Sequence, residues 1–210
     1  LSVNGKLVIY GGPGVGKSFF VTEWGWQAGL GLPLFDSYKV EKPLRGLYIQ
    51  VEVGAWELQE RTRNIEAMWG TSPNFIVHTM PKFSIVERKT DTIETAKMLK
   101  LDYIVYDPWY LMIDGGENSI EDIRPALLAI NEVAEATQTA TIVLAHTKKE
   151  VYTNTGTIVD NGNDALSGHK GLANWADTIG RLNGDKVTAA LTWTKMRNGR
   201  LLDPLLLTRL

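Results

Sequence analysis

The chain has 210 residues, of which 44% are hydrophobic and 22% charged, as in an ordinary globular protein. Its formal net charge of −2 gives no global positive field for nucleic acid, so any site for a polyanion must be a local patch. The absence of cysteine excludes disulfides, thiolate metal ligands and cysteine nucleophiles. No apolar run approaches the length of about 18 residues that spans a membrane, so we expect no membrane partner.

Apolar runs bounded by turn residues alternate with segments of helical period. In chain order we predict a strand at 7–10, a helix at 18–28, a strand at 47–51, a helix at 55–69, a strand at 75–78, a helix at 92–100, a strand at 103–106, a helix at 120–137, a strand at 141–145, a short helix at 166–175, and antiparallel strands at 178–182, 187–194 and 202–208. Alternating strands and helices predict an α/β fold with a mostly parallel central sheet covered on both faces. Since one sheet accounts for every element, we predict a single domain over 1–210. The chain begins almost at its first strand, which also fits a fragment of a longer protein.

The segment 11–18, Gly-Gly-Pro-Gly-Val-Gly-Lys-Ser, fits the phosphate-binding pattern G-x-x-x-x-G-K-[ST] and lies between a predicted strand and a predicted helix. Glycines let the backbone aim several N–H groups at one anion, and the helix amino terminus adds a positive dipole end. Lys17 would reach the β- and γ-phosphates of ATP, and the Ser18 hydroxyl would bind Mg²⁺. The alternative is a glycine-rich turn that happens to precede Lys-Ser. The predicted nucleotide-binding residues are Gly12, Pro13, Gly14, Val15, Gly16, Lys17, Ser18 and Phe19.

Two acidic residues follow predicted strands, whose carboxyl ends meet at one edge of a parallel sheet. Asp107 is predicted to hold Mg²⁺ together with Ser18, the alternative being a turn aspartate before Pro108. Glu52 could polarise the water that attacks the γ-phosphate, the alternative being an exposed carboxylate at a strand end.

Three further residues are candidates for catalysis. His146 ends the strand at 141–145 and could sense the γ-phosphate, although a histidine at a strand end is more often structural. Lys195 and Arg197 alternate with Met196, which puts both on one face of an edge strand. They would either protect the sheet edge or reach the ATP of a neighbouring subunit. The candidate catalytic residues are therefore Glu52, Lys17, His146, Lys195 and Arg197.

With these residues in this order, the chain resembles the RecA-like core of hexameric replicative helicases, especially the DnaB-type and plasmid RepA-type enzymes. The matching segments are 47–53 with Leu58 and Arg61, 107–118, 144–148, 164–168 with Ala176 and Asp177, and 194–199. The last of these, Thr-Lys-Met-Arg-Asn-Gly, resembles the K-x-R-x-G segment of the family, and we call 194–199 the finger segment.

The resemblance implies a RecA-like P-loop NTPase that hydrolyses ATP with Mg²⁺, forms a hexameric ring with ATP between subunits, and binds single-stranded DNA. It implies that Glu52 is the catalytic base. It also places two loops in a central channel, at about 114–119 and 148–163. The candidate DNA-binding residues are Lys148, Lys149, His169 and Lys170, for which the alternative is a solvated charge run.

The sequence leaves two other functions open. The same core serves recombination and repair ATPases that form filaments, and nucleotide-switched regulatory ATPases that bind protein rather than DNA. An ATP-dependent enzyme of any of these kinds is expected in the cytoplasm.

Overall fold

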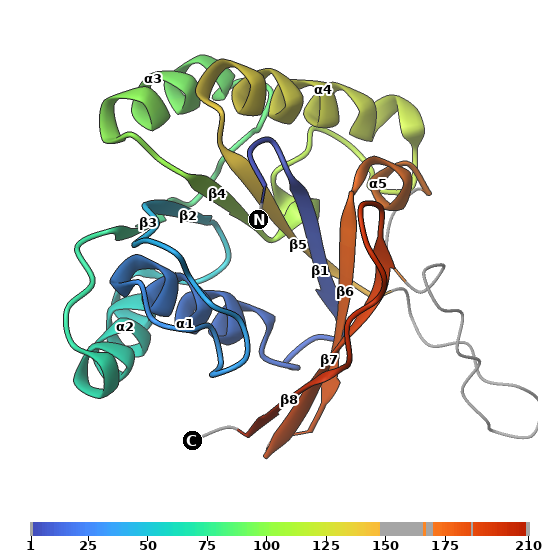
Figure 1. Cartoon of the computed structure of the whole chain (residues 1–210). Helices are drawn as coiled ribbons and strands as arrows, with labels where there is room; N and C mark the ends of the chain where they lie inside the picture. The colour runs from blue at the N-terminus through green and yellow to red at the C-terminus, as the bar shows by residue number, and fades with distance from the viewer. Residues whose placement is uncertain (1, 148–165, 167–169, 186, 209–210) are drawn as a thin grey trace, which may run out of the picture.

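The computed structural model describes residues 2–147, 166, 170–185 and 187–208. Its strands are β1 Lys6–Gly11, β2 Gly46–Gln50, β3 Phe75–Thr79, β4 Tyr103–Asp107, β5 Ala140–His146, β6 Thr178–Gly184, β7 Thr188–Met196 and β8 Leu205–Thr208. Its helices are α1 Lys17–Leu30, α2 Ala55–Trp69, α3 Lys89–Leu99, the 3-10 helix η1 Trp109–Leu111, α4 Ile120–Thr137 and α5 Lys170–Trp175. All of these strands join one sheet (Figure 1).

The sheet is mostly parallel, as predicted, with the strand order β3-β2-β4-β5-β1-β6-β7-β8. β1 lies between β5 and β6 and is parallel to both. The sequence analysis grouped β6 with the antiparallel strands; β6 does pair antiparallel with β7, and β7 with β8, but β6 is also parallel to β1. β6 is therefore the last strand of the parallel part and the first strand of the C-terminal hairpins.

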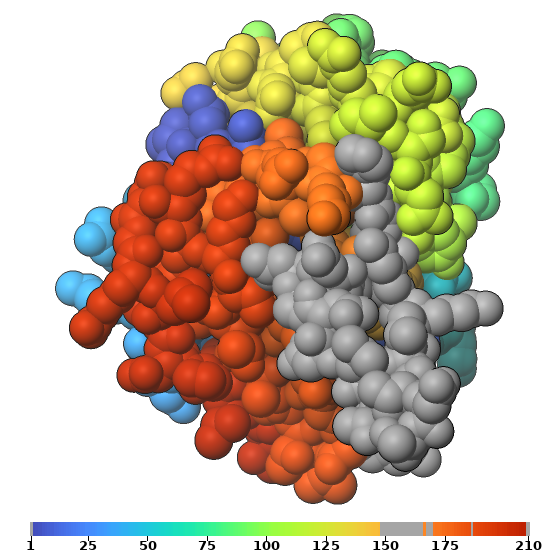
Figure 2. Space-filling model, turned by 90° about the vertical axis from the view of Figure 1, so that its right-hand side faces the viewer, coloured from blue at the N-terminus to red at the C-terminus, as the bar shows by residue number. Residues whose placement is uncertain are grey.

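Helices cover both faces of the sheet, with α1 and α2 on one face and α3, α4 and α5 on the other (Figure 1). Alternation along β1 explains the two cores: Leu7 and Ile9 pack with the side chains of α1, whereas Val8 and Tyr10 pack with those of α4 and α5. The hairpin strands β6 to β8 extend beyond the helices, and Figure 2 shows their orange and red surface below the yellow and green helices.

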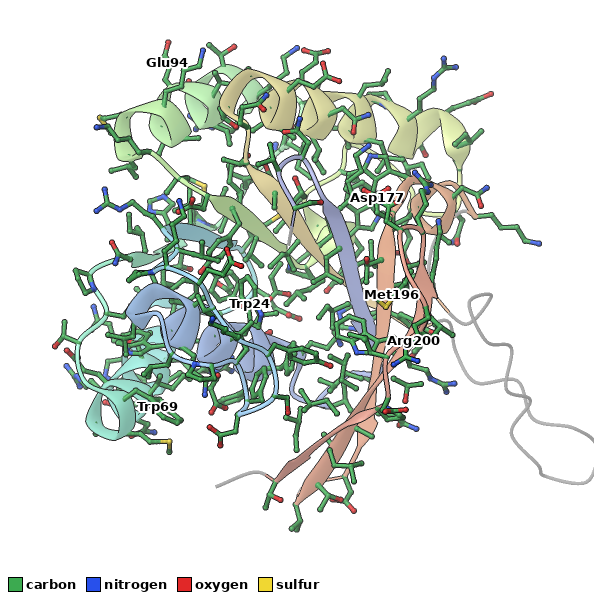
Figure 3. The ribbon with its side chains drawn as sticks, viewed as in Figure 1. Trp24, Trp69, Glu94, Asp177, Met196 and Arg200 are labelled. Atoms are coloured by element: carbon green, nitrogen blue, oxygen red, sulfur yellow. The ribbon has the colours of Figure 1, made fainter. Side chains whose placement is uncertain are left out.

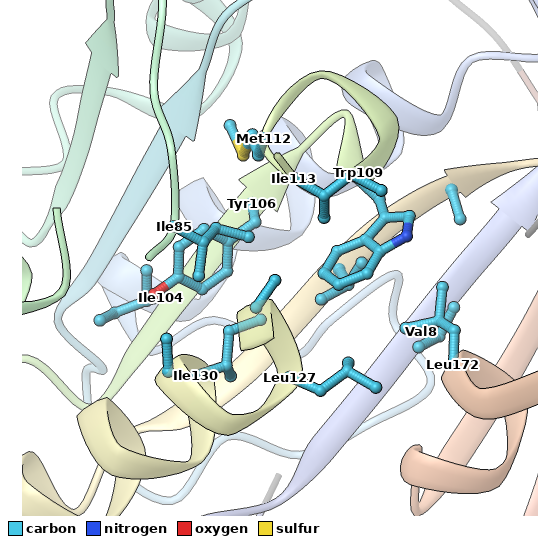
Figure 4. Packing of buried hydrophobic residues seen from close by; sticks show 14 of the residues in the cluster. Val8, Ile85, Ile104, Tyr106, Trp109, Met112, Ile113, Leu127, Ile130 and Leu172 are labelled. Atoms are coloured by element: carbon cyan, nitrogen blue, oxygen red, sulfur yellow. The ribbon is translucent and has the colours of Figure 1, made fainter. Parts of the chain in front are cut away.

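The longest helix follows the predicted pattern. α4 spans Ile120–Thr137, as predicted, and Ser119 caps it by accepting a hydrogen bond from the backbone N–H of Glu121. Its buried stripe includes Ile123, Leu127 and Ile130, which belong to the same core cluster as Trp109; Figure 4 shows Leu127 and Ile130 on the side of that cluster where α4 lies. Each turn of the helix thus contributes to the core that fixes the carboxyl end of β4.

α1 lies unusually close to the sheet at Gly25. A Cβ atom at this position would lie 2.2 Å from Cε2 of Phe75 on β3, so only glycine permits this approach. Within the part of the chain that the structure describes, no helix is both long and apolar enough to cross a membrane.

Candidate nucleotide-binding site

The predicted phosphate loop connects the carboxyl end of β1 to α1. Gly14 and Gly16 have φ angles of 71° and 89°, in the left-handed region that favours glycine. Gly11 is required for a different reason, because an added Cβ would lie 2.3 Å from the backbone oxygen of Leu182 on β6. The loop is thus curved by its glycines and packed tightly against the neighbouring strand.

The amino terminus of α1 is suited to an anion. No side chain caps it, and its first turn contains no acidic residue. Its first backbone N–H groups have no partner within the helix, and the helix dipole adds positive potential there. Together with the curved loop, this end of α1 provides the donors and the field that a phosphate group requires.

Lys17 is buried, and its ammonium donates to the backbone oxygens of Gly11 and Gly12, each at 2.9 Å. Burial lowers the pKa of Lys17, whereas the negative charges of Asp107 and Glu52 oppose this shift. The cation therefore sits on the loop itself, beside two carboxylates, which is where the β- and γ-phosphates are expected.

Asp107 ends β4 and is 3% exposed. Its Oδ2 accepts hydrogen bonds from the Ser18 hydroxyl at 2.7 Å and from the Tyr48 hydroxyl. Burial raises the pKa of Asp107, while these two hydrogen bonds act in the opposite direction. The carboxylate is therefore directed at Ser18 on α1. The alternative interpretation was a turn aspartate before Pro108.

The pair Ser18 and Asp107 fits a magnesium ion. Mg²⁺ in nucleotide sites usually takes one or two protein oxygens and completes its shell with phosphate oxygens and waters. Among the described residues, no group of three or more histidine or acidic side chains could hold a metal ion by itself. A magnesium ion at Ser18 and Asp107 would therefore also need oxygens of the bound nucleotide and of water.

Glu52 lies just beyond β2, in an exposed bend. Its charge raises the pKa of Lys17 and that of Asp107, which places it beside the phosphate loop. The structure therefore brings together Lys17, Ser18, Glu52 and Asp107 from three separate segments of the chain. An exposed carboxylate at this point is available to a water molecule that approaches a bound γ-phosphate.

His146 ends β5 and pairs with Gly11 at the end of β1. Its ring contacts the ring of Tyr110 edge-on, with centroids 5.3 Å apart. Burial, followed by the charge of Lys17, lowers the pKa of His146, while Glu52, Asp107 and Glu117 oppose this shift. The histidine thus lies beside the phosphate loop, and the charge of Glu117 in the segment 114–119 acts on it.

We predict that the imidazole of His146 remains neutral to a lower pH than an ordinary histidine, whose pKa is about 6.5. Because the unfolded chain then binds this proton more readily, the residue's contribution to the free energy of unfolding is present above about pH 6.5 and is lost as the pH falls toward the folded pKa. NMR titration of the ring protons measures this pKa, and Lys17→Met should raise it. A value at or above 6.5 in the wild type would contradict the prediction.

Two tyrosines of the site had not been predicted. The Tyr48 hydroxyl bonds Asp107, and Tyr110 packs against His146 from η1. No local sequence pattern marks either residue, because each reaches the site through the pairing of strands that are distant in sequence. A polar aromatic in the centre of a buried strand, as at Tyr48, is the one available signal, since a buried hydroxyl requires a partner.

Lys195 and Arg197 lie near the amino ends of the parallel strands, whereas the phosphate loop of their own chain follows the carboxyl end of β1. Thr178 at the start of β6 pairs with both Leu7 on β1 and Met196 on β7, which fixes the finger segment at the amino ends of the parallel strands. β1 runs from there to the loop, a distance of about 15 Å at the usual rise per residue. Both side chains contact the end of α5, although Arg197 follows the last residue of β7.

Only part of β7 is an unpaired outer strand of the sheet. β7 pairs with β8 over 188–191, so the outermost strand is β8, and the prediction of β7 as the edge strand is wrong for that half. The half that carries Lys195 extends beyond this pairing. Figure 3 shows Asp177, Met196 and Arg200 in this region, on the same side as β6 and β7.

Most candidate DNA-binding residues, Lys148, Lys149 and His169, lie outside the described residues, as does the predicted channel loop at 148–163. Lys170 is the exposed first residue of α5. The other predicted loop, 114–119, is described: it leads into α4 and is held at its base, where the backbone N–H of Gly116 donates to Asp122.

Comparison with known proteins identifies relatives of this fold. Residues 4–151 match the family model AAA_25, described as an AAA domain. Among solved structures, the chain is similar to a DnaB-like replicative helicase described with its interactions with primase (TM-score 0.71, 15% identity, covering 100% of this chain and 57% of that one). It is also similar to a second structure, described as an ATPase domain (TM-score 0.68, 15% identity, 99% and 82%), and to the KaiC-like protein PH0186 from Pyrococcus horikoshii OT3 (TM-score 0.60, 15% identity, 96% and 83%).

These comparisons confirm the predicted RecA-like P-loop fold. The chain spans 57% of the length of the DnaB-like helicase chain. No curated protein matches the chain. The AAA_25 match covers the phosphate loop, Glu52, Asp107 and His146 but ends before the finger segment.

Proposed function

Since the chain belongs to the AAA_25 family of AAA domains, we propose that this P-loop ATPase is the motor core of a DNA helicase or translocase of the DnaB and RepA type. The observation that carries the proposal is the joint placement of Lys17, Ser18, Glu52, Asp107 and His146 around one phosphate loop. These groups supply every function that hydrolysis of a nucleoside triphosphate requires from one subunit.

In this proposal, the phosphate loop and α1 hold the phosphates, and Lys17 turns from the loop carbonyls to the β- and γ-oxygens. Ser18 and Asp107 would hold Mg²⁺, which neutralises charge on the phosphates when bound. Glu52 orients the attacking water and takes its proton. The lowered pKa of His146 favours the neutral imidazole, which can donate to or accept from a γ-phosphate oxygen.

The position of the finger segment supports assembly into a ring. Arg197 and Lys195 lie at the amino ends of the parallel strands, so the length of β1 separates them from the phosphate loop of their own chain. An arginine supplied by a neighbouring subunit stabilises charge on the transferred phosphoryl group. We infer that ATP lies between subunits, as the resemblance to hexameric helicases implies.

Single-stranded DNA is the proposed substrate of the ring, gripped by the loops at 114–119 and 148–163. The fold likeness to a DnaB-like replicative helicase motivates this choice. Because the chain has a net charge of −2, the proposed contact is local, and binding should weaken steeply with salt if lysines neutralise phosphates there.

The test is the rate of ATP hydrolysis by the assembled protein, with and without single-stranded DNA. We expect DNA to increase kcat at least severalfold and double-stranded DNA to be a weaker activator. Electron microscopy of the ATP-bound protein on DNA would distinguish closed rings from the filaments of a recombination ATPase. A verified oligomer that binds no DNA at low salt, and whose rate of ATP hydrolysis does not change when DNA is added, would contradict the helicase proposal. That result would favour a nucleotide-switched regulatory protein.

A further inference from the structure

The two carboxylate oxygens of Asp107 have different surroundings. Oδ2 accepts hydrogen bonds from the hydroxyls of Ser18 and Tyr48, which together use both lone pairs of that oxygen. No group among the described residues donates a hydrogen bond to Oδ1. Oδ1 is therefore the atom of this buried carboxylate that is left for a ligand, either a cation or a water molecule bound to one.

The two donors to Oδ2 differ in what else they do. Ser18 is the second residue of α1, and its hydroxyl is also the group that would bind Mg²⁺. Tyr48 lies in the middle of β2 and is 1% exposed. A phenol has one proton to donate, and Tyr48 donates it to Asp107. The bond from Tyr48 is thus the one that can persist while the Ser18 oxygen becomes a metal ligand.

Packing holds the ring of Tyr48 in place. The ring is stacked with that of Phe75 on β3, with centroids 6.2 Å apart and planes inclined by 15°. Phe75 is in turn pressed against α1 at Gly25, where an added Cβ would lie 2.2 Å from its ring. Since α1 also carries Ser18, the contacts form a closed chain from α1 through Phe75, Tyr48 and Asp107 back to α1. Neither nucleotide nor metal is needed to complete it.

Strand register explains why a tyrosine reaches this carboxylate. Tyr48 pairs with Val105 on β4, and Asp107 lies two residues further along the same face of that strand. Such a diagonal neighbour is about 7–8 Å away, which is within reach of an aromatic side chain. A phenylalanine at position 48 would fill the same space but would supply no donor.

We propose that Tyr48 is a positioning residue for the magnesium ion of the nucleotide. Its hydroxyl holds Oδ2 of Asp107, and thereby keeps Oδ1 directed at the metal when Ser18 becomes a ligand. This inference rests on the proposed function, in which Ser18 and Asp107 hold Mg²⁺. Removing a group that hydrogen-bonds a metal ligand typically lowers metal affinity by about 10–100-fold, so the role is open to measurement.

The test is the affinity of the protein for a fluorescent, non-hydrolysable ATP analogue, measured over a range of Mg²⁺ concentrations and in EDTA. In Tyr48→Phe, the Mg²⁺ concentration that gives half of the increase in affinity should rise by about tenfold or more. The affinity in EDTA should stay within about twofold of the wild-type value, because the phosphate loop is untouched. An unchanged Mg²⁺ requirement in a folded Tyr48→Phe protein would overturn the proposal.

Tyr103→Phe is the matched control. Tyr103 belongs to the same core cluster as Tyr48, is equally buried, and donates its hydroxyl to the backbone oxygen of Gly25 at 3.4 Å, not to Asp107. Its removal should leave the Mg²⁺ requirement at the wild-type value. If both variants raised that requirement equally, the cause would be a loosened core, and the positioning role would be refuted.

A double-mutant cycle shows whether Tyr48 acts through Asp107. Asp107→Asn should raise the Mg²⁺ requirement, and adding Tyr48→Phe to it should have little further effect. Fully additive losses would mean that the phenol acts by another route, contrary to the proposal. If Asp107→Asn itself left the requirement unchanged, the proposed metal site would fail, and the positioning role with it. If only Tyr48→Phe were silent, the metal site would stand without Tyr48.

The wild-type protein offers a measurement that needs no variant. A crystal structure with Mg²⁺ and the analogue should retain the bond from Tyr48 to Oδ2 of Asp107, with Oδ1 facing the metal. A structure in which the phenol has left the carboxylate, or in which Oδ2 faces the metal, would refute the assignment.

Discussion

Glu52→Gln is expected to lower kcat for ATP hydrolysis by about 10²–10⁴-fold, the contribution typical of a general base. The amide keeps the size of the side chain but cannot take a proton from water. Because Glu52 lies in an exposed bend beyond β2, the substitution should leave folding unchanged. Steady-state phosphate release, with fluorescence binding of an ATP analogue measured in parallel, separates lost chemistry from lost binding.

Nucleotide binding should be retained in Glu52→Gln and could tighten slightly, since a negative charge near the phosphates is removed. Glu57→Gln is the matched control: it removes an equal charge from the first turn of α2, where Glu57 pairs with Arg61. This control should hydrolyse ATP at close to the wild-type rate. An equal loss of kcat in both variants would show that hydrolysis depends on the overall negative charge near the phosphate loop and that Glu52 is not the general base.

The phosphate loop could be predicted from sequence because its chemistry is local. Eight consecutive residues specify the curvature, the cation and the hydroxyl, and the flanking strand and helix follow from short apolar patterns. Asp107 and His146 were also predictable, since each directly follows a run of buried strand residues and parallel strands end at one edge. Helices α2 and α4 were predicted to the residue, each with a clear stop or start signal at Gly70 or Ser119.

The rest of the site depends on tertiary pairing. Tyr48 meets Asp107 only because β2 lies beside β4, and nothing near Tyr48 in the sequence indicates that neighbour. The contact of Lys195 with α5 depends on the register of β6 and β7, which includes a shift between Ile179 and Gly180. α3 begins at Lys89, three residues before its predicted start, because its N-cap residue Arg88 makes no side-chain cap and gives no boundary signal.

Proximity of predicted residues was also misleading in one respect. Lys195 and Arg197 alternate on one face, which invites a single role for both. The structure places them on the same helix end but with different numbers of bonds and different exposure. Sequence alternation determines the direction of a side chain, whereas the partner it meets determines whether it is free to move.

Arg197→Ala should cause the largest loss of the substitutions considered, about 10³–10⁵-fold in kcat, as for other arginines supplied in trans. The variant should fold normally, because it loses one exposed ion pair with Asp177, worth at most about 1 kcal/mol, and one exposed hydrogen bond to Asn174. Arg200→Ala is the matched control: Arg200 is exposed in the turn after β7, and its removal should leave kcat near the wild-type value.

Mixing the two inactive variants decides where Arg197 acts. A ring of Arg197→Ala and Glu52→Gln subunits contains some interfaces at which an intact Glu52 faces an intact Arg197 from the neighbour. In a random equimolar ring these interfaces are about one quarter of the total, so hydrolysis should return to a measurable fraction of the wild-type rate. Native mass spectrometry verifies that mixed rings have formed. If their activity stays at the level of the separate variants, Arg197 acts on the ATP of its own subunit. That result would be difficult to reconcile with the length of β1 between them, and the shared ATP site would have to be abandoned.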